Sequence, residues 1–330
     1  MNKIVTVLIF ISCFKLFSQT PVLIWEQNYL SPNSYFQSIT KTDDGDFVLQ
    51  AFEGNFPSVT NFPILKINTD GNLIWNIINN GVSYSVDSKK NIVQHNDNHI
   101  YLIDENYNTS TANNFSLYQY NSLGVLINHW SYPYSDKLTI SKLINTNDNG
   151  FLAVGSINVI NPIQREIGWV VKIDAFKNIE WVRLLNDSSE INSKIYAAVN
   201  IVNGEFLIAG YQSENNMSDS NYYLAKLSQD GFLIWERTFG GSENEDVRSI
   251  IELANGNFLL LGSTLSTDGD VSNNNGIMNV WAVITDVSGN LVSQSIIINN
   301  DIAYAEATAI AESDGGYTVG IMSNCNESIN

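Results

Sequence analysis

Residues 230–235 read Asp-Gly-Phe-Leu-Ile-Trp, and residues 70–75 read Asp-Gly-Asn-Leu-Ile-Trp. Asp-Gly accepts a positive φ angle in a tight turn, and the aliphatic run after it favours a short strand. Looser copies end in tryptophan, and Val22–Trp25 has the same phase. The tryptophans of this motif are Trp25, Trp75, Trp130, Trp181 and Trp235, separated by 50, 55, 51 and 54 positions. This spacing predicts a tandem repeat of about fifty residues.

Two further landmarks recur within each repeat. One is an Asn-Gly turn followed by an apolar run that ends in glycine, as in Asn149–Gly155, Asn203–Gly210 and Asn255–Gly262. The other is a short strand that contains lysine, as in Leu224–Leu227. An alternating stretch such as Ile191–Val202 supplies one more strand. Four short strands per repeat predict an all-β fold, a β-propeller of four-stranded blades.

The blade count follows from the ends of the repeats. We predict one domain over residues 20–330, with units that end near Trp75, Trp130, Trp181, Trp235 and Ser293 and then a partial unit. Ile302–Ser323 supplies two strands of that unit. We therefore expect about six blades, the last incomplete, with the strand around Trp25 in position to complete it.

The first nineteen residues have the pattern of a secretory signal peptide. Lys3 precedes an apolar run, Ile4–Phe14, that is too short to span a bilayer comfortably, and Ser18-Gln19-Thr20 offers a small polar exit. Alternatives are a buried first strand, a membrane anchor, or a lipoprotein with Cys13 as the lipidated residue. The other cysteine is Cys325, so removal of residues 1–19 leaves no intramolecular disulfide.

Composition limits the partners. The net charge of -18 repels a phosphate backbone, which disfavours nucleic acid. Charged residues are only 15 % of the chain, so Asn, Ser and Thr must carry much of the polar surface. After residue 20 no segment is long and apolar enough to predict a transmembrane helix. We expect a secreted or cell-surface protein.

One stretch carries a resemblance to a known group. Trp235–Ser242, followed by Asp246, Gly256–Phe258, Gly262–Thr264 and Ser266–Val271, resembles the exported repeat β-propellers of gliding and related bacteria, many of which carry a C-terminal sorting domain for type IX secretion. The resemblance implies an extracellular or cell-surface location and little known chemistry. The chain departs from that group because it carries no C-terminal sorting domain.

No catalytic constellation stands out. Asp268 and Asp270 are a weak calcium candidate, because their loop places oxygen ligands at alternate positions but lacks a distal glutamate. The histidines, His95, His99 and His129, fall in the degenerate second unit without zinc-site spacing. No nucleophile motif is present. The repeated tryptophans are interpreted as packing elements between blades, with sugar binding as the alternative.

These observations favour a non-enzymatic scaffold that presents loops to an extracellular protein or glycan. The most variable loops lie between the second and third strands of a unit, for example Ser213–Asn221 and Ser266–Asn279. No cofactor is expected apart from the calcium candidate. An extracellular glycan hydrolase, with a carboxylate pair assembled by the fold, and a quinoprotein-like propeller are the enzymatic alternatives.

Overall fold

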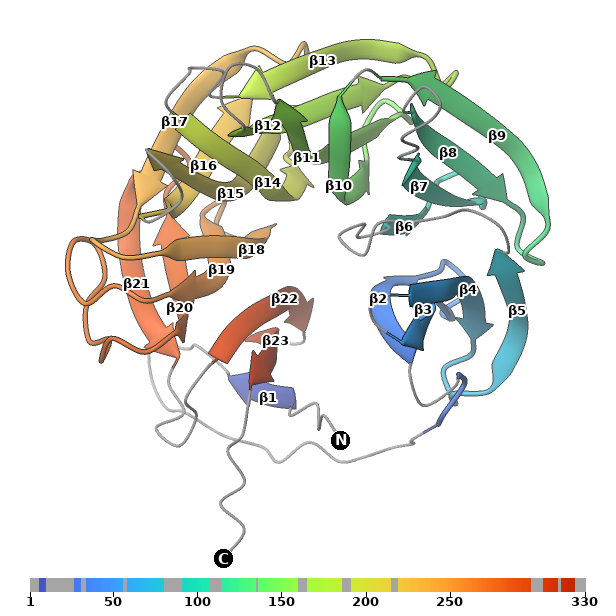
Figure 1. Ribbon diagram of the computed structural model, residues 1–330, viewed down its shortest axis with the longest axis horizontal. Coiled ribbons are helices and arrows are strands. Elements are labelled where there is room, and N and C mark those ends of the chain that lie inside the picture. Colours follow the sequence, from blue (N-terminus) through green and yellow to red (C-terminus); the bar gives the residue numbers. More distant parts are fainter. Residues whose placement is uncertain are drawn as a thin grey trace, which may run out of the picture. The chain divides into compact units, whose positions relative to one another are not determined.

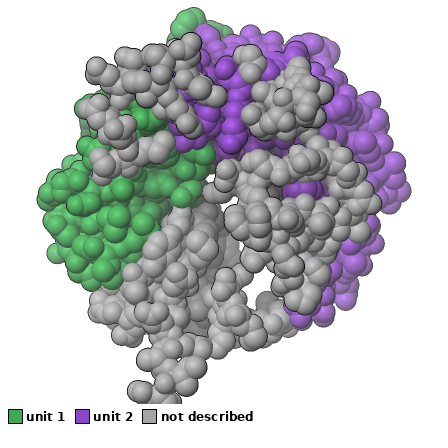
Figure 2. Space-filling view, viewed as in Figure 1, with its two compact units in different colours: residues 1–22, 185–330 green, residues 23–184 purple. Residues whose placement is uncertain are grey.

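The computed structural model describes residues 6–9, 27–30, 34–55, 58–79, 91–106, 114–134, 136–159, 165–185, 191–214, 219–297, 305–313 and 316–323. Every regular element within these ranges is a strand, as the repeat predicts (Figure 1). Among the described residues no helix is long and apolar enough to cross a membrane. The chain folds as two compact units, residues 23–184 and residues 1–22 with 185–330 (Figure 2).

The first unit, residues 23–184, contains three four-stranded antiparallel sheets, each built from consecutive strands. Their strands are β2 (Ser34–Lys41), β3 (Phe47–Asn55), β4 (Ser58–Ile67), β5 (Leu73–Asn79), β6 (Asn91–Gln94), β7 (Ile100–Asn106), β8 (Asn114–Tyr120), β9 (Leu126–Pro133), β10 (Lys137–Asn145), β11 (Phe151–Val159), β12 (Arg165–Ile173) and β13 (Ile179–Leu185). Each sheet is one blade and corresponds to one sequence repeat.

The second unit contains two more four-stranded sheets and one three-stranded sheet. The four-stranded sheets are built from β14 (Ile191–Asn200), β15 (Phe206–Glu214), β16 (Asn221–Leu227), β17 (Leu233–Phe239), β18 (Glu245–Glu252), β19 (Phe258–Thr264), β20 (Asn279–Thr285) and β21 (Leu291–Ile297). The three-stranded sheet joins β1 (Thr6–Ile9), β23 (Gly316–Ser323) and β22 (Ala305–Ser313) in that order.

The predicted count of about six four-stranded blades is therefore wrong: the described residues form five. After β21 the described chain supplies only β22 and β23, and β1 pairs with β23 from Thr6 opposite Gly320 to Ile9 opposite Tyr317. Trp25, which was expected to complete this blade, lies outside the described residues. The expected signal peptide includes β1, and its removal stays a prediction.

Tight turns close the hairpins of every four-stranded blade. In the turn after β4, the N–H of Gly71 donates to the carbonyl of Asn68, and the N–H of Asn68 donates to the carbonyl of Asn72, both at 3.0 Å. Gly71 has a φ of 78°, which glycine adopts without steric cost. The Asp-Gly motif that predicted the repeat thus forms the turn it was expected to form.

Blades pack face to face within each unit. All seven residues of β19 are buried, which agrees with the unbroken apolar run Phe258–Leu261. Leu260 joins a core with Leu224 of the preceding blade and Trp281 of its own. In the other unit, Phe115 of β8 and Trp169 of β12 share a core and meet edge to face, with ring centroids 5.4 Å apart. Burial on both faces of a strand explains the lack of alternation.

A lysine on the third strand of three blades pairs with an acidic residue of the turn between the first two strands. The pairs are Lys66 with Asp44 and Asp46, Lys172 with Asp148 at 2.7 Å, and Lys226 with Glu205 at 2.6 Å. Where Ile284 replaces the lysine, the corresponding turn contains Asn255 and Asn257 and no acid. The lysine of the repeat is therefore part of the blade's internal structure.

Candidate functional site

Antiparallel pairing separates the tight turns of a blade from its long loops. In the blade of β18–β21 the turns at 253–257 and 286–290 lie at one end, and the loop 265–278 between β19 and β20 lies at the other (Figure 1). The connection 240–244, which leads from β17 into β18, lies beside that loop, because Leu265 N–H donates to the carbonyl of Asn244 at 3.0 Å. We call segments 240–244 and 265–278 the loop platform.

The side chain of Glu245, the first residue of β18, binds both segments of the loop platform. Its side chain is fully buried and accepts hydrogen bonds from the Thr264 hydroxyl at 2.6 Å and from the N–H of Gly241 at 2.9 Å. The N–H of Ser266 is 3.3 Å from the same carboxylate. Burial raises the pKa of Glu245, and these bonds offset only part of the rise. One carboxylate thus ties both segments of the platform to the blade.

Asp268 and Asp270, the calcium candidates, hold the same two segments together. Asp268 Oδ1 accepts from the N–H of Ser242 at 2.8 Å, and Asp270 Oδ2 accepts from the N–H of Gly240 at 3.2 Å. Within the described ranges no group of three or more His, Cys, Asp or Glu side chains is arranged to hold a metal ion. Binding of calcium stays a prediction, but the geometry gives both residues a role in joining the loops.

Hydrogen bonds of asparagine side chains also fix the shape of the loop 265–278. Asn279 is buried, and its Nδ2 donates to Asn274 Oδ1 at 2.7 Å and to Asn275 Oδ1 at 3.1 Å. Asn274 Nδ2 donates to the carbonyl of Ser266 at 2.8 Å. The side chains left on the surface include Ser272 and Asn273, which are polar and uncharged. The loop is therefore held in one shape, and its exposed side chains include amides and hydroxyls as well as the carboxylates of Asp268 and Asp270. Of the other predicted loop, Ser213–Asn221, residues 215–218 lie outside the described residues.

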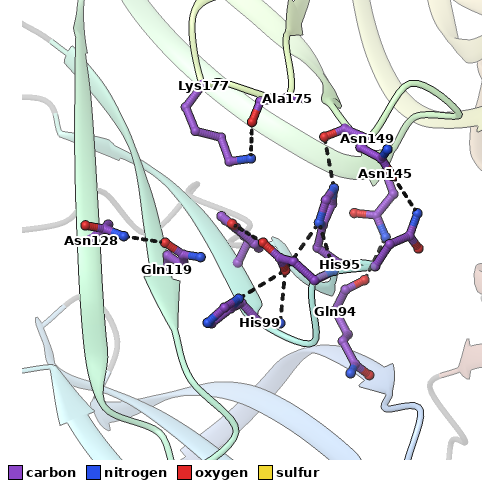
Figure 3. Close-up of polar contacts among 12 residues, drawn as sticks. Gln94, His95, His99, Gln119, Asn128, Asn145, Asn149, Ala175 and Lys177 are labelled. Atoms are coloured by element: carbon purple, nitrogen blue, oxygen red, sulfur yellow. Dashed lines mark hydrogen bonds and ion pairs between the residues drawn. The ribbon is translucent and has the colours of Figure 1, made fainter.

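A second polar cluster lies in the hairpin between β6 and β7 (Figure 3). Asp97 accepts from the Tyr101 hydroxyl at 2.8 Å and from the N–H of His99 at 3.0 Å, and its Oδ1 is 3.3 Å from Nδ1 of both His95 and His99. Burial raises the pKa of Asp97, but the bonds from Tyr101 and His99 outweigh it, so the pKa lies below its ordinary value. His95 Nε2 donates to the carbonyl of Asn149 at 3.0 Å, so this cluster joins the turns of two successive blades.

Lys177 contacts this cluster from the turn between β12 and β13. Its φ of 72° is in the left-handed region, where the equivalent turns carry Gly71, Gly124, Gly231 and Gly289. Its Nζ lies 5.2 Å from the centroid of the Tyr101 ring and donates to the carbonyl of Ala175 at 2.8 Å. Burial lowers the pKa of Lys177. The Asp-Gly motif did not predict a lysine at this turn position. The contacts of Lys177 with the Tyr101 ring and the Ala175 carbonyl are those of a packing residue.

The repeated tryptophans Trp75, Trp130, Trp181 and Trp235 lie on the last strands of four blades, β5, β9, β13 and β17. Trp75, Trp130 and Trp235 are partly buried and pack against cores shared with the next blade of their unit. Trp75 Nε1 donates to the carbonyl of Ser122 in that blade at 2.9 Å. Trp181 has the guanidinium of Arg183 5.7 Å from its ring centroid. His129, also from the degenerate repeat, stacks on Tyr118 with ring centroids 4.8 Å apart. These contacts fit the interpretation as packing elements.

No protein-family model matches the chain. No curated protein matches it in sequence either. Solved structures do match in fold. A protein of unknown function from Dyadobacter fermentans has 10 % sequence identity, covers 89 % of this chain and 96 % of its own, and superposes with a TM-score of 0.56.

Two fungal enzymes are similar at the same level. The Penicillium chrysogenum alpha-L-arabinanase, solved with arabinobiose, has 12 % identity, covers 90 % of this chain and 95 % of its own, and gives a TM-score of 0.51. The GH93 alpha-L-arabinofuranosidase of Fusarium graminearum has 12 % identity, covers 91 % and 95 %, and gives a TM-score of 0.50. At these identities the likeness concerns the fold alone, and with the five four-stranded blades it makes the chain a β-propeller.

Proposed function

We propose that the protein is a non-enzymatic, secreted or cell-surface β-propeller that presents its loops to an extracellular protein or glycan. The observation that carries this proposal is the loop platform. The carboxylates of Asp268 and Asp270 within the platform, and of Glu245 next to it, accept hydrogen bonds from the platform's own N–H groups. Carboxylates used in this way make a rigid surface, and a rigid loop loses little conformational entropy on binding.

The exposed side chains of the platform support a polar partner without negative charge. Ser272, Asn273 and Asn275 are exposed, and so are the acidic residues Glu243, Asp268 and Asp270. Amide and hydroxyl groups can both donate and accept hydrogen bonds. Sugar hydroxyls and peptide groups have the same two-sided capacity. The N-terminal signal-peptide pattern supports an extracellular setting for such a partner.

A glycan and protein interaction screen with the full chain tests the proposal. We expect binding that Asn273→Ala and Asn275→Ala weaken, and that a control change in an exposed turn of the other unit, Asn72→Ala, leaves unchanged. Binding lost on chelation would instead assign Asp268 and Asp270 to a calcium site. No binding to any arrayed glycan or protein would contradict the proposal.

Two of the solved structures with a similar fold are an arabinanase and an arabinofuranosidase, so hydrolysis is the competing function. Incubation of the full chain with each glycan of the screen, followed by chromatography of the products, distinguishes the two. Release of shorter sugars would make the protein an enzyme and overturn the non-enzymatic proposal. Binding without product release supports it.

A further inference from the structure

The backbone N–H groups at the start of the loop platform are bonded within the protein. Each of the four residues 240–243 donates to a side-chain oxygen. The acceptors are Asp270 Oδ2 for Gly240 at 3.2 Å, Glu245 for Gly241 at 2.9 Å, Asp268 Oδ1 for Ser242 at 2.8 Å and Ser266 Oγ for Glu243 at 2.9 Å. A row of successive N–H groups commonly binds an anion. Here the protein's own oxygens occupy these donors, so they are not available to an anionic ligand.

The platform also carries carboxylates whose charge is not neutralised by an ion pair. Glu243, Asp268 and Asp270 are exposed, and within the described residues none of the three forms an ion pair. Segments 240–244 and 265–278 contain no lysine, arginine or histidine. Asp268 and Asp270 each use one carboxylate oxygen for the bonds above, and the other oxygen has no hydrogen-bond partner in the described part of the chain. The exposed surface of the platform is therefore negative and rich in acceptors.

A fourth exposed carboxylate comes from the neighbouring blade of the same unit. Asp219 lies in the loop between β15 and β16 and is followed by Ser220. The N–H of Ser220 donates to Asn244 Oδ1 at 3.0 Å, and its carbonyl accepts from the N–H of Glu245 at 2.6 Å. Asp219, too, forms no ion pair in the described residues. These bonds place Asp219 beside segment 240–244, so the acidic surface extends over two blades.

A buried amide is a second, independent sign that the platform accepts a hydrogen-bond donor. Asn279 is 1 % exposed, and its side chain points into the loop 265–278, because its Nδ2 donates to the side chains of Asn274 and Asn275. Its Oδ1 has no hydrogen-bond partner among the described residues. A buried carbonyl oxygen without a donor costs free energy, and a ligand that supplies an N–H group removes that cost.

We propose that the loop platform binds a basic segment of an extracellular protein, with lysine or arginine side chains against Glu243, Asp268 and Asp270. Cationic side chains pair with the carboxylates, and the backbone N–H groups of the same segment donate to exposed amide oxygens such as that of Asn273. Opposite charges on the two surfaces favour association and exclude acidic partners. The proposal names the partner of the function proposed above and rests on that function.

Two other cationic ligands match this surface less well. Ca²⁺ takes about six to eight oxygen ligands that converge on one point. Within the described ranges no group of three or more acidic or histidine side chains is arranged in that way. An amino sugar has a cation on each ring, but its remaining polar groups are hydroxyls, which accept as well as donate. The N–H groups of a basic peptide only donate, and this suits a surface of oxygens.

Fluorescence polarisation with the full chain tests the partner. The probe is a labelled peptide of alternating lysine and serine, and its uncharged counterpart has acetyl-lysine at every lysine position. We expect the lysine peptide to bind about tenfold more tightly than its counterpart, with an affinity that falls as salt rises. Glu243→Gln should weaken this binding about threefold, which is the size of one exposed ion pair.

A triple variant, Glu243→Gln with Asp268→Asn and Asp270→Asn, should weaken binding of the lysine peptide about tenfold. Asparagine keeps a side-chain oxygen that accepts from the N–H groups of Ser242 and Gly240, so the change removes charge and retains the loop contacts. If the triple variant does not fold, as judged by circular dichroism, Glu243→Gln and Asp219→Asn decide. Neither of these two side chains forms a hydrogen bond or ion pair in the described residues.

Glu252→Gln is the matched control. Glu252 ends β18, the strand that Glu245 begins, so this change removes the same charge from the opposite end of the same blade. It should leave binding unchanged. The comparison with Glu243→Gln separates an effect of the platform from an effect of the net charge of -18.

Four results would overturn the proposal. They are no binding of the lysine peptide at millimolar concentration, equal binding of the lysine and acetyl-lysine peptides, a loss with Glu252→Gln as large as with Glu243→Gln, and tighter binding of Ca²⁺ alone or of a glucosamine oligomer than of the peptide. The interaction screen with Asn273→Ala separates this failure from failure of the function proposed above. If a neutral glycan or another protein binds, Asn273→Ala weakens that binding and the lysine peptide does not bind, the platform is a binding surface but its partner is not basic.

Discussion

The indole N–H of Trp75 donates a 2.9 Å hydrogen bond to the carbonyl of Ser122, two residues before Gly124 in the next blade. The indole covers Gly124, which has a φ of 81°, and a Cβ atom there would lie 3.1 Å from the Trp75 ring and 2.9 Å from Ile77 Cδ1. Trp235 covers Gly289 in the same way. A tryptophan on the last strand of one blade thus packs on a glycine turn of the next.

We expect Gly124→Ala to destabilise the protein for two reasons. The left-handed conformation costs about 1 to 2 kcal/mol for an L-residue, and the contact with Trp75 adds about 1 to 3 kcal/mol. Gly45→Ala is the control, because Gly45 has a φ of 89° but no atom lies within 4 Å of the added carbon. Urea denaturation measures both. Equal losses in the two variants would show that the contact with the indole contributes nothing.

Gly262→Ala should be more damaging. The new methyl group would lie 2.0 Å from the carbonyl oxygen of Asp246, and backbone cannot move aside as a side chain can. We expect a loss of about 3 kcal/mol or more in the free energy of unfolding. Gly256→Ala in the same blade has the left-handed cost alone, since its nearest neighbour is Val287 Cγ1 at 3.6 Å. A loss no larger than that of Gly256→Ala would mean that the β-bulge at Arg248, next to the pair of Val247 with Gly262, relaxes easily.

The ion pair of Lys172 should respond differently to loss of the cation and loss of the anions. The lysine side chain is 1 % exposed and binds Asp148 at 2.7 Å and Glu180 at 2.8 Å, whose side chains are 33 % and 42 % exposed. Lys172→Met leaves carboxylates that water can solvate, so we expect a change within about 1 kcal/mol. The double variant Asp148→Asn, Glu180→Gln leaves a buried cation and should cost about 3 to 5 kcal/mol. Chemical denaturation of both variants decides this, and the reverse order would refute the asymmetry.

Glu245 should make stability depend on pH. Burial raises its pKa in the folded state, so the folded protein binds this proton more tightly than the unfolded chain does. The resulting stability is complete below the unfolded value, near 4.5, and is lost as pH rises through the raised folded pKa. Glu245→Gln cannot titrate, so the stability of the wild type relative to this variant should be greater below pH 4.5 than at neutral pH. A pH-independent difference between the two unfolding free energies would be evidence against the buried charge.

Much of the fold could be predicted because its signals are local. Asp-Gly and Asn-Gly adopt the turn within four or five residues, and the apolar run after each turn needs no distant partner to be recognised as a strand. The blade count could not be obtained this way. Whether the sheet of β22 and β23 gains a third strand depends on β1, about three hundred residues away in the chain, and a pairing at that separation leaves no local pattern.

The candidate sites also have a part that local sequence signals predicted and a part that depends on contacts between distant residues. The variable loop Ser266–Asn279 was recognised from its length and composition, but the sequence suggested calcium for Asp268 and Asp270, where the structure shows bonds to the N–H groups of another segment. The contact between Tyr196 of β14 and Arg248 of β18, whose guanidinium carbon is 4.3 Å from the centroid of the Tyr196 ring, was missed altogether. The available signal was the glycine that ends each apolar run. Gly210 and Gly262 pair with the residues just before Tyr196 and Arg248, each of which is the extra residue of a β-bulge.

The amino-acid sequence by itself determined the repeat, its strands, its turns and the acidic, asparagine-rich surface, since turn preference, strand preference and charge belong to residues and their immediate neighbours. Only the tertiary structure decided which residues meet: the carboxylate of Glu245 beneath two loops, Trp75 on Gly124, and Arg248 on Tyr196. Each of these contacts joins different strands or loops, and for two of them different blades. The physical reason is that such contacts depend on pairing register, bulges and blade packing, which arise only when distant parts of the chain come together.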